Sequence, residues 1–159
     1  MSDIKGFARQ PGEGDRRSFF GGGEHVWKAT AADTGGSLFA FEDLLEEGKL
    51  TPLHAHPDAD EMVYVLEGEI ELHRDGALER LGSGGFAFTP RGTPHAFRVT
   101  ATPTRVLAVQ TPGTGDAFYL QASEPAGEGS GAVDFPRVVE AARQTGSTAV
   151  LGPPPFSPA

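Results

Sequence analysis

Short segments of alternating or continuous apolar residues recur along this chain about every eight to twelve residues, with turn residues between them. The clearest segment, EMVYVLEG at 61–68, runs through aromatic and β-branched residues to a glycine. The next, EIELHRDG at 69–76, alternates before an Asp-Gly pair that favours a hairpin. Because 22 glycines and 13 prolines in 159 residues leave little room for long helices, the pattern predicts an all-β sandwich or barrel.

The same signals place the individual elements. We expect a turn at 31–37 and strands at 24–30, 38–44, 50–56, 61–68, 69–76, 77–85 (closing in a Gly-rich turn), 86–90, 95–100, 104–111 and 116–123. Asp134 is a candidate cap, and Pro136 a first-turn residue, for a helix over roughly 135–145. We therefore expect a flexible arm (1–17), one β-barrel domain (18–123), and a linker, short helix and Pro-rich tail that pack on the barrel (124–159).

Charge and composition limit the partners. The formal net charge of −9 and the pI near 4.9 leave no large basic face, so we expect neither nucleic acid nor an anionic membrane surface as a partner. No apolar run approaches the ~18–20 residues that span a bilayer, and residues 1–17 lack the apolar core of a secretion signal, so we expect a cytoplasmic protein. Since cysteine is absent, any metal must be bound by His, Asp, Glu or water.

The segment HAHPDADE (54–61) carries the strongest chemical signal. On a strand, His54 and His56 share a face about 6.5–7 Å apart, and Glu61 opens the next strand after a turn. A second segment, PRGTPHAF, places His95 at the start of another strand. Three imidazoles and one carboxylate can bind a divalent first-row metal and leave positions open for a substrate. An isolated His-x-His pair, however, is more often a partly solvated strand edge, so the surrounding spacing decides.

That spacing resembles the two motifs of the cupin family. Five residues separate Gly48 from His54, one separates His54 from His56, four lead to Glu61 and six to Gly68; the second motif is formed by Gly84, Pro90, Gly92 and His95. Val99 departs from the family pattern, which often has Asn there, and this puts only local packing in doubt. A narrower likeness, to single-domain bacterial cupins of the quercetin dioxygenase type, rests on FAFEDLLEEGKLTPLHAHPDADEMVYVLEGEIEL, GGFAFTPRGTPHAFRV and the tail LGPPPF.

The resemblance implies a cupin jelly-roll β-barrel with one metal ion inside. The implied ligands are His54, His56, Glu61 and His95. The ion could be Ni, Mn, Fe, Co, Cu or Zn, because a mixed set of this kind does not select among them. Family habit also implies a homodimer formed through a sheet edge.

Strand parity predicts the substrate-binding residues. We expect apolar side chains around the metal from Phe39, Phe41, Val63, Val65, Phe86, Phe88 and Phe97, with core or dimer packing as the alternative for each. An apolar, aromatic cavity suits a small apolar or aromatic substrate better than a sugar or acid. We expect surface roles for Arg91 and Arg98, surface or strand-edge roles for His25 and His73, packing for Tyr119, and turn roles for Asp58 and Asp60.

Three functions remain open at this point. The resemblance implies a dioxygenase that cleaves a flavonol-like or related aromatic enol with O2 and releases carbon monoxide, with Glu61 as both metal ligand and catalytic base. The alternatives are a metal-assisted, non-oxidative cyclase or isomerase of an aromatic polyketide-like substrate, and a non-catalytic cupin that binds a small molecule.

Overall fold

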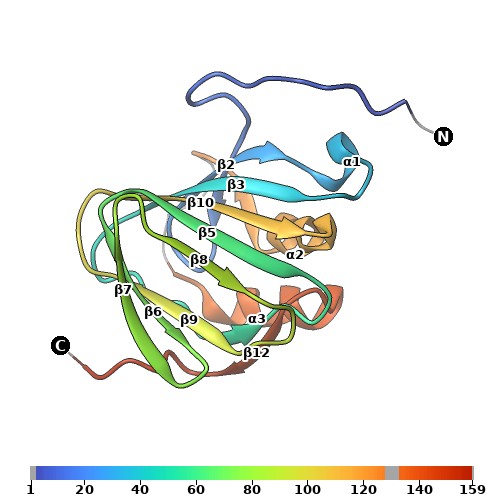
Figure 1. Ribbon diagram of the computed structural model, residues 1–159. Coiled ribbons are helices and arrows are strands. Elements are labelled where there is room, and N and C mark those ends of the chain that lie inside the picture. Colours follow the sequence, from blue (N-terminus) through green and yellow to red (C-terminus); the bar gives the residue numbers. More distant parts are fainter. Residues whose placement is uncertain (1–2, 128–132, 159) are drawn as a thin grey trace.

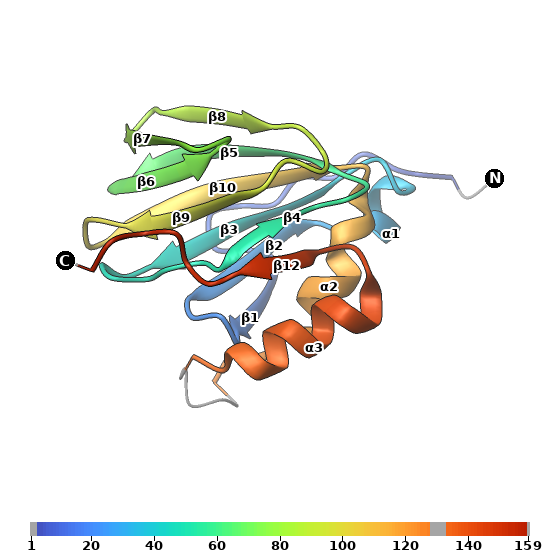
Figure 2. The same cartoon turned by 90° about the horizontal axis from the view of Figure 1, so that it is seen from below.

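The computed structural model describes residues 3–127 and 133–158 (Figure 1). Within them the chain forms two antiparallel sheets. The larger sheet runs, in spatial order, through β11 (Ser123–Pro125), β1 (Asp15–Phe19), β2 (Glu24–Ala29), β3 (Phe39–Leu45), β10 (Thr104–Thr111), β5 (Asp60–Glu67) and β8 (Phe86–Thr89). The smaller runs through β12 (Ala149–Gly152), β4 (Leu53–Ala55), β9 (His95–Val99), β6 (Glu69–Arg74) and β7 (Ala77–Gly82). This is the expected all-β jelly roll, seen from below in Figure 2.

Strand register brings distant segments to one place. In the smaller sheet, His54 on β4 is the direct partner of His95 on β9. In the larger sheet, Glu61 on β5 is paired with Gln110 on β10 and with Thr89 on β8. The expected ligand residues therefore come from both sheets and meet between them.

Helices are few and short in the described part of the chain. They are α1 (Ala31–Thr34), the 3₁₀ turn η1 (Gly113–Gly115), α2 (Asp116–Gln121) and α3 (Phe135–Thr145). The expected helix over 135–145 is confirmed, with the Asp134 side chain accepting a hydrogen bond from the Arg137 amide at the cap. None of these helices has the length and apolar character needed to cross a membrane.

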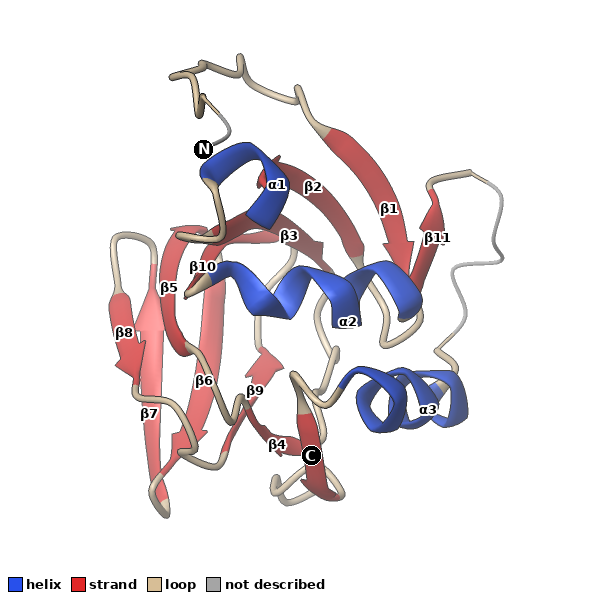
Figure 3. Cartoon of the chain, turned by 90° about the vertical axis from the view of Figure 1, so that its right-hand side faces the viewer, coloured by secondary structure: helices blue, strands red, loops and turns tan. Residues whose placement is uncertain are grey.

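The expected final strand at 116–123 is wrong, because this segment forms α2. Phe118, Tyr119 and Ala122 lie on one helical face and are buried, whereas Leu120 between them is exposed. Strand alternation would have put Phe118 and Leu120 on the same face. Figure 3 shows α2 and α3 next to each other at one side of the barrel.

Three short strands fall where none is expected. β1 begins at Asp15, inside the expected arm, and pairs with β11 from the expected linker; β12 lies before the Pro-rich tail and pairs with β4. Residues 128–132 of the expected linker lie outside the described residues. Between 31 and 37, where we expect only a turn, α1 forms, with a reciprocal capping box between Thr30 and Asp33.

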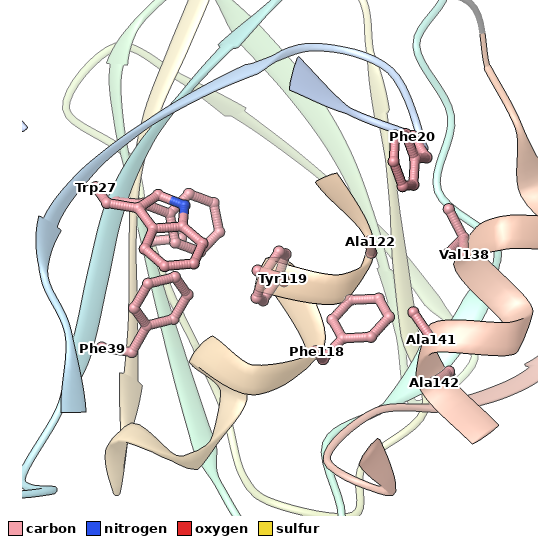
Figure 4. Packing of buried hydrophobic residues seen from close by; sticks show 11 residues of the cluster. Phe20, Trp27, Phe39, Phe118, Tyr119, Ala122, Val138, Ala141 and Ala142 are labelled. Atoms are coloured by element: carbon pink, nitrogen blue, oxygen red, sulfur yellow. The ribbon is translucent and has the colours of Figure 1, made fainter. Parts of the chain in front are cut away.

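Two apolar clusters fill the interior. The larger joins the aromatic residues of the large sheet to α2 and α3, and Figure 4 shows its packing; its members are Phe20, Trp27, Phe39, Phe41, Ala108, Phe118, Tyr119, Ala122, Val138, Ala141 and Ala142. The smaller contains Leu45, Val65, Ile70, Val99 and Val106. α2 and α3 thus cover one side of the interior, where a sandwich of two sheets would otherwise be open to water.

Candidate metal centre and its cavity

Three histidines converge between the sheets. His54, His56 and His95 each offer one ring nitrogen, and these nitrogens lie within 4.8 Å of one another. His56 and His95 are 2% exposed, and His54 is half-buried. Such a cluster can hold a metal ion, because neutral imidazole is a common ligand of first-row divalent metals.

Contacts around the histidines fix which nitrogen faces the centre. His54 Nδ1 lies 2.8 Å from the Pro52 carbonyl oxygen, and His95 Nδ1 lies 2.9 Å from that of Thr93. Because a carbonyl only accepts, each Nδ1 carries a proton, and each Nε2 is the ring nitrogen left for the centre. His56 Nδ1 lies 3.3 Å from the Thr148 hydroxyl, from the segment before β12.

Glu61 adds a carboxylate to the cluster. Its Oε2 lies 3.0 Å from His56 Nε2, and its Oε1 lies 3.2 Å from His95 Nε2. The Gln110 side-chain amide donates to Glu61 Oε2 at 2.9 Å and lies 3.2 Å from His56 Nε2. Gln110 is absent from the sequence prediction. Its inward parity with Val106 and Ala108 is the signal that could have found it, since a fully buried glutamine at such a position needs polar partners.

The pKa shifts favour a bound cation. Burial, with help from His95 and His56, lowers the pKa of His54 well below its usual value. Burial acts to raise the pKa of Glu61, but the attraction and hydrogen bonds of His56 and His95 outweigh it and hold that pKa well below its usual value. Burial acts to lower the pKa of His95, but the hydrogen bond and negative charge of Glu61, together with the Thr93 carbonyl, outweigh burial and raise that pKa. A proton is therefore held among the same atoms that a metal would bind, so metal binding should release it.

The donor set fits a divalent transition metal. Three imidazole nitrogens lie close together, and a carboxylate lies about 3 Å from two of them. These are the ligand types of such sites, and the hydrogen bonds to the outer ring nitrogens orient the imidazoles as metal ligands are usually oriented.

A cavity of about 60 Å³ opens beside the cluster and is lined by its His54 and Glu61. Of the expected substrate residues, Phe41, Val63 and Phe97 line it. Phe39 and Val65 are buried in the two apolar clusters instead, outside the lining.

Phe86 and Phe88, which we expected around the metal, point away from it. They are 58% and 46% exposed, on the outer face of β8. The register explains this, because Phe88 pairs with Met62 and Phe86 with Tyr64, whereas Ala87 pairs with the inward Val63. Tyr119, for which packing is the main expectation and reaching a ligand the alternative, packs in the larger apolar cluster and also lines the cavity.

His25, for which we expected a surface or strand-edge role, is buried instead. It is 1% exposed, and its ring lies between those of Phe19, at 4.8 Å, and Phe41, at 4.5 Å. Burial lowers its pKa to about 3. Its parity with Trp27 was the available signal for an inward position. Asp43 and Lys49 accompany it in the cavity wall; burial raises the pKa of Asp43 to about 7 and lowers that of Lys49 to about 8.

The remaining polar residues behave largely as expected. Arg91 is exposed and binds the Asp60 carboxylate through its backbone amide at 2.9 Å and its guanidinium at 3.1 Å, which ties the turn before β9 to the start of β5. Arg98 binds Glu71 on the outer face of the small sheet and lies over the Phe156 ring at 5.3 Å. His73 packs edge-on against the same ring. Phe156 of the tail therefore lies beside Arg98 and His73 of the small sheet.

Comparison with known proteins agrees with this architecture. The cupin domain model matches residues 41–110. Quercetin 2,3-dioxygenase of Bacillus subtilis is 38% identical over 119 residues, which are 72% of this chain and 34% of that protein. Dimethylsulfoniopropionate lyase DddQ of Ruegeria pomeroyi is 38% identical over 74 residues, or 46% of this chain and 36% of that protein. The chain thus spans about a third of the length of these two relatives.

A solved structure shows the same fold. An RmlC-like cupin from Shewanella frigidimarina superposes with a TM-score of 0.61 at 21% identity, covering 73% of this chain and 98% of that one. The matched domain model, the similarity to quercetin 2,3-dioxygenase and this shared fold agree with the two motifs that surround the histidines. The chain belongs to the cupin superfamily.

Proposed function

We propose that the protein is a metal-dependent dioxygenase acting on a flavonol-like or related aromatic enol. His54, His56, Glu61 and His95 would hold one divalent transition metal. The observation that carries the proposal is the cluster of three imidazoles and one carboxylate at the wall of a cavity lined mainly by apolar and aromatic side chains. The similarity to quercetin 2,3-dioxygenase supports it.

In this proposed reaction, different residues of the chain transfer the proton, orient the carboxylate and contact the substrate. A divalent metal held by these residues would supply Lewis-acid chemistry that lowers the pKa of a substrate hydroxyl. Glu61 takes the proton of that hydroxyl, since its carboxylate lies in the cavity wall. Gln110 keeps the carboxylate turned towards the histidines by donating to Oε2. Phe41, Val63 and Phe97 exclude water and contact the flat face of the substrate.

The cavity volume favours a second candidate. About 60 Å³ holds a few water molecules and is below the ~300 Å³ at which ligand pockets commonly begin, so a flavonol requires the lining to move. A smaller substrate requires less movement. We therefore keep a metal-assisted, non-oxidative reaction, a cyclisation or isomerisation begun by proton transfer to Glu61, as the alternative. The lyase among the relatives supports such chemistry on a cupin.

Oxygen uptake separates the two. Protein purified without added metal is first assigned its ion by elemental analysis, and is then mixed with a panel of flavonols in an oxygen electrode. We expect one O2 consumed and one carbon monoxide released for each flavonol lost. Substrate loss without oxygen uptake would establish the non-oxidative alternative, and tight metal binding without turnover of any substrate would leave a binding protein.

The domain limits (1–17, 18–123, 124–159), the homodimer and the cytoplasmic location stay predictions. Gel filtration with light scattering tests the homodimer.

A further inference from the structure

A second polar group lies in the wall of the cavity, apart from the metal centre. His25 and Asp43 line the same cavity as His54 and Glu61, and they are only 1% and 6% exposed. They come from neighbouring strands, β2 and β3, where they are direct register partners. The proposed chemistry at the histidine cluster uses neither of them.

Both groups have hydrogen-bonding atoms to spare. Among the described residues, His25 Nδ1 and Asp43 Oδ1 have no hydrogen-bond partner. Their closest approach to each other, His25 Nε2 to Asp43 Oδ1, is 3.5 Å, which is too long for a good hydrogen bond. Buried polar atoms are rarely left unpaired, because desolvation is then uncompensated. A ligand that enters the cavity is therefore the natural partner for both.

Lys49 explains why an acidic group is tolerated there. Its ammonium group donates to the carbonyl oxygens of Gly21 and Gly22 and lies 5.1 Å from the centre of the Phe19 ring. Its charge acts to lower the pKa of Asp43, against the larger effect of burial. Lys49 thus balances the charge of Asp43, while its ammonium group donates hydrogen bonds to the backbone.

The strand register separates this pair from the metal centre. On β3, Phe39, Phe41 and Asp43 share one face, and Phe39 is aligned with Gln110, the partner of Glu61. Four residues of strand correspond to about 13 Å of backbone. The row between them is apolar, with Phe41 next to Ala108 and Ala108 next to Val63. The part of the cavity wall formed by the large sheet is therefore polar at both ends and apolar in the middle.

We propose that His25 and Asp43 bind a hydroxyl group at the end of the substrate remote from the metal centre. The inference rests on the proposed function and narrows its substrate class to apolar, largely aromatic molecules with an oxygen at each end. A hydroxyl both donates and accepts a hydrogen bond, so it can satisfy an imidazole nitrogen and a carboxyl oxygen together. The pKa of Asp43, raised by burial to about 7, lets the pair accept or donate near neutral pH.

Two single-ring probes, phenol and toluene, test this without turnover. They have nearly the same shape and differ by a hydroxyl in place of a methyl group, and toluene is the more hydrophobic, so a preference for phenol requires a hydrogen bond. Calorimetry on the purified protein should give at least about tenfold tighter binding of phenol. The preference should vanish in His25→Phe, which keeps a ring between Phe19 and Phe41. It should fall in Asp43→Asn, and it should persist in the control His73→Phe.

The outcomes separate this inference from the proposed function. A wild-type protein that binds both probes equally, or a His25→Phe variant that keeps the preference, overturns the inference even if flavonols are turned over. Should His25→Phe not fold, Asp43→Asn decides on the same criterion. A His25-dependent preference for phenol in a protein that consumes no oxygen with any flavonol leaves the inference standing and removes the dioxygenase proposal alone.

Discussion

Gln110 and Glu61 face each other across β10 and β5, and the glutamine amide donates to the carboxylate at 2.9 Å. The contact orients Glu61 towards His56 and His95. The Gln110 side chain is fully buried. Gln110 is not one of the proposed metal ligands, so its role is to position one of them.

We expect Gln110→Leu to weaken metal binding by about 10–100-fold, the range typical for the loss of a group that orients a ligand. Competition with a chromophoric chelator measures this directly. Gln121→Leu, at an exposed position of α2, is the matched control and should leave the affinity unchanged. An unaltered affinity in Gln110→Leu would show that Glu61 needs no such support.

Gly115→Ala should act on the same contact from a distance. A Cβ at this position would lie 1.7 Å from Gln110 Oε1, whereas the backbone, at φ −70°, accepts alanine without strain. The glutamine must therefore turn away, and we expect a fall in metal affinity similar to that of Gln110→Leu. The double variant should be no weaker than either single one. Gly82→Ala, where a Cβ meets nothing within 4 Å, is the control.

The metal ligands were predictable because the cupin spacing is local. Gly48 to Gly68 and Gly84 to His95 are two continuous segments, and each ligand keeps its place whatever the remote strands do. The role of Gln110 depends on β10 lying next to β5, a pairing of distant segments that no local pattern specifies. Parity alone marks Gln110 as inward without saying what it meets.

Short strands were missed for a related reason. β12 pairs with β4, and its Val150 is aligned with His54, almost a hundred residues earlier in the chain. β1 pairs with β11 over a similar separation. Segments of three to five residues carry too few side chains for a periodic signal. In α2, packing overrode the strand propensity of the aromatic residues. Phe118 and Tyr119 are buried from one helical face against α3 and the large sheet.

Glu61→Gln separates holding the metal from moving a proton. The amide keeps an oxygen ligand but cannot take a proton, so we expect turnover to fall by about 10²–10⁴-fold, the usual contribution of a general base. Metal affinity should fall less, by about 10–100-fold. Rates are compared at saturating metal, with loading checked by elemental analysis. Wild-type turnover in the loaded variant would exclude the base role.

His25 should make the fold sensitive to acid. Its pKa, about 3 when buried against an ordinary 6.5, means that the unfolded chain binds a proton before the folded chain does. Stability is therefore complete above pH 6.5 and is lost as the pH falls towards 3. At about 1.4 kcal/mol for each pKa unit, the loss amounts to a few kcal/mol. Asp43, with its pKa raised from 3.8 to about 7, acts oppositely and loses stability as the pH rises through that range.

Urea denaturation of His25→Phe across this pH range tests the assignment. The variant should lose a few kcal/mol less than the wild type between pH about 7 and about 4, because phenylalanine has no proton to bind. His73→Phe replaces a histidine that lies outside the cavity lining, and its unfolding free energy should vary with pH as that of the wild type does. If the unfolding free energies of His25→Phe and the wild type changed in parallel with pH, His25 would bind its proton as readily in the folded chain as in the unfolded chain.

Gly68 should tolerate alanine far less well than Gly48, although both have positive φ, at 82° and 89°. At Gly48 a Cβ meets nothing within 4 Å, so we expect only the left-handed backbone cost of about 1–2 kcal/mol. At Gly68 the Cβ would lie 2.6 Å from the Pro103 carbonyl oxygen, which is backbone, and still closer to the Thr104 hydroxyl. Thermal or urea unfolding should therefore show Gly68→Ala losing at least about 2 kcal/mol more than Gly48→Ala. Equal losses would mean that the loop before β10 moves aside freely, and that Gly68 is required for its backbone conformation alone.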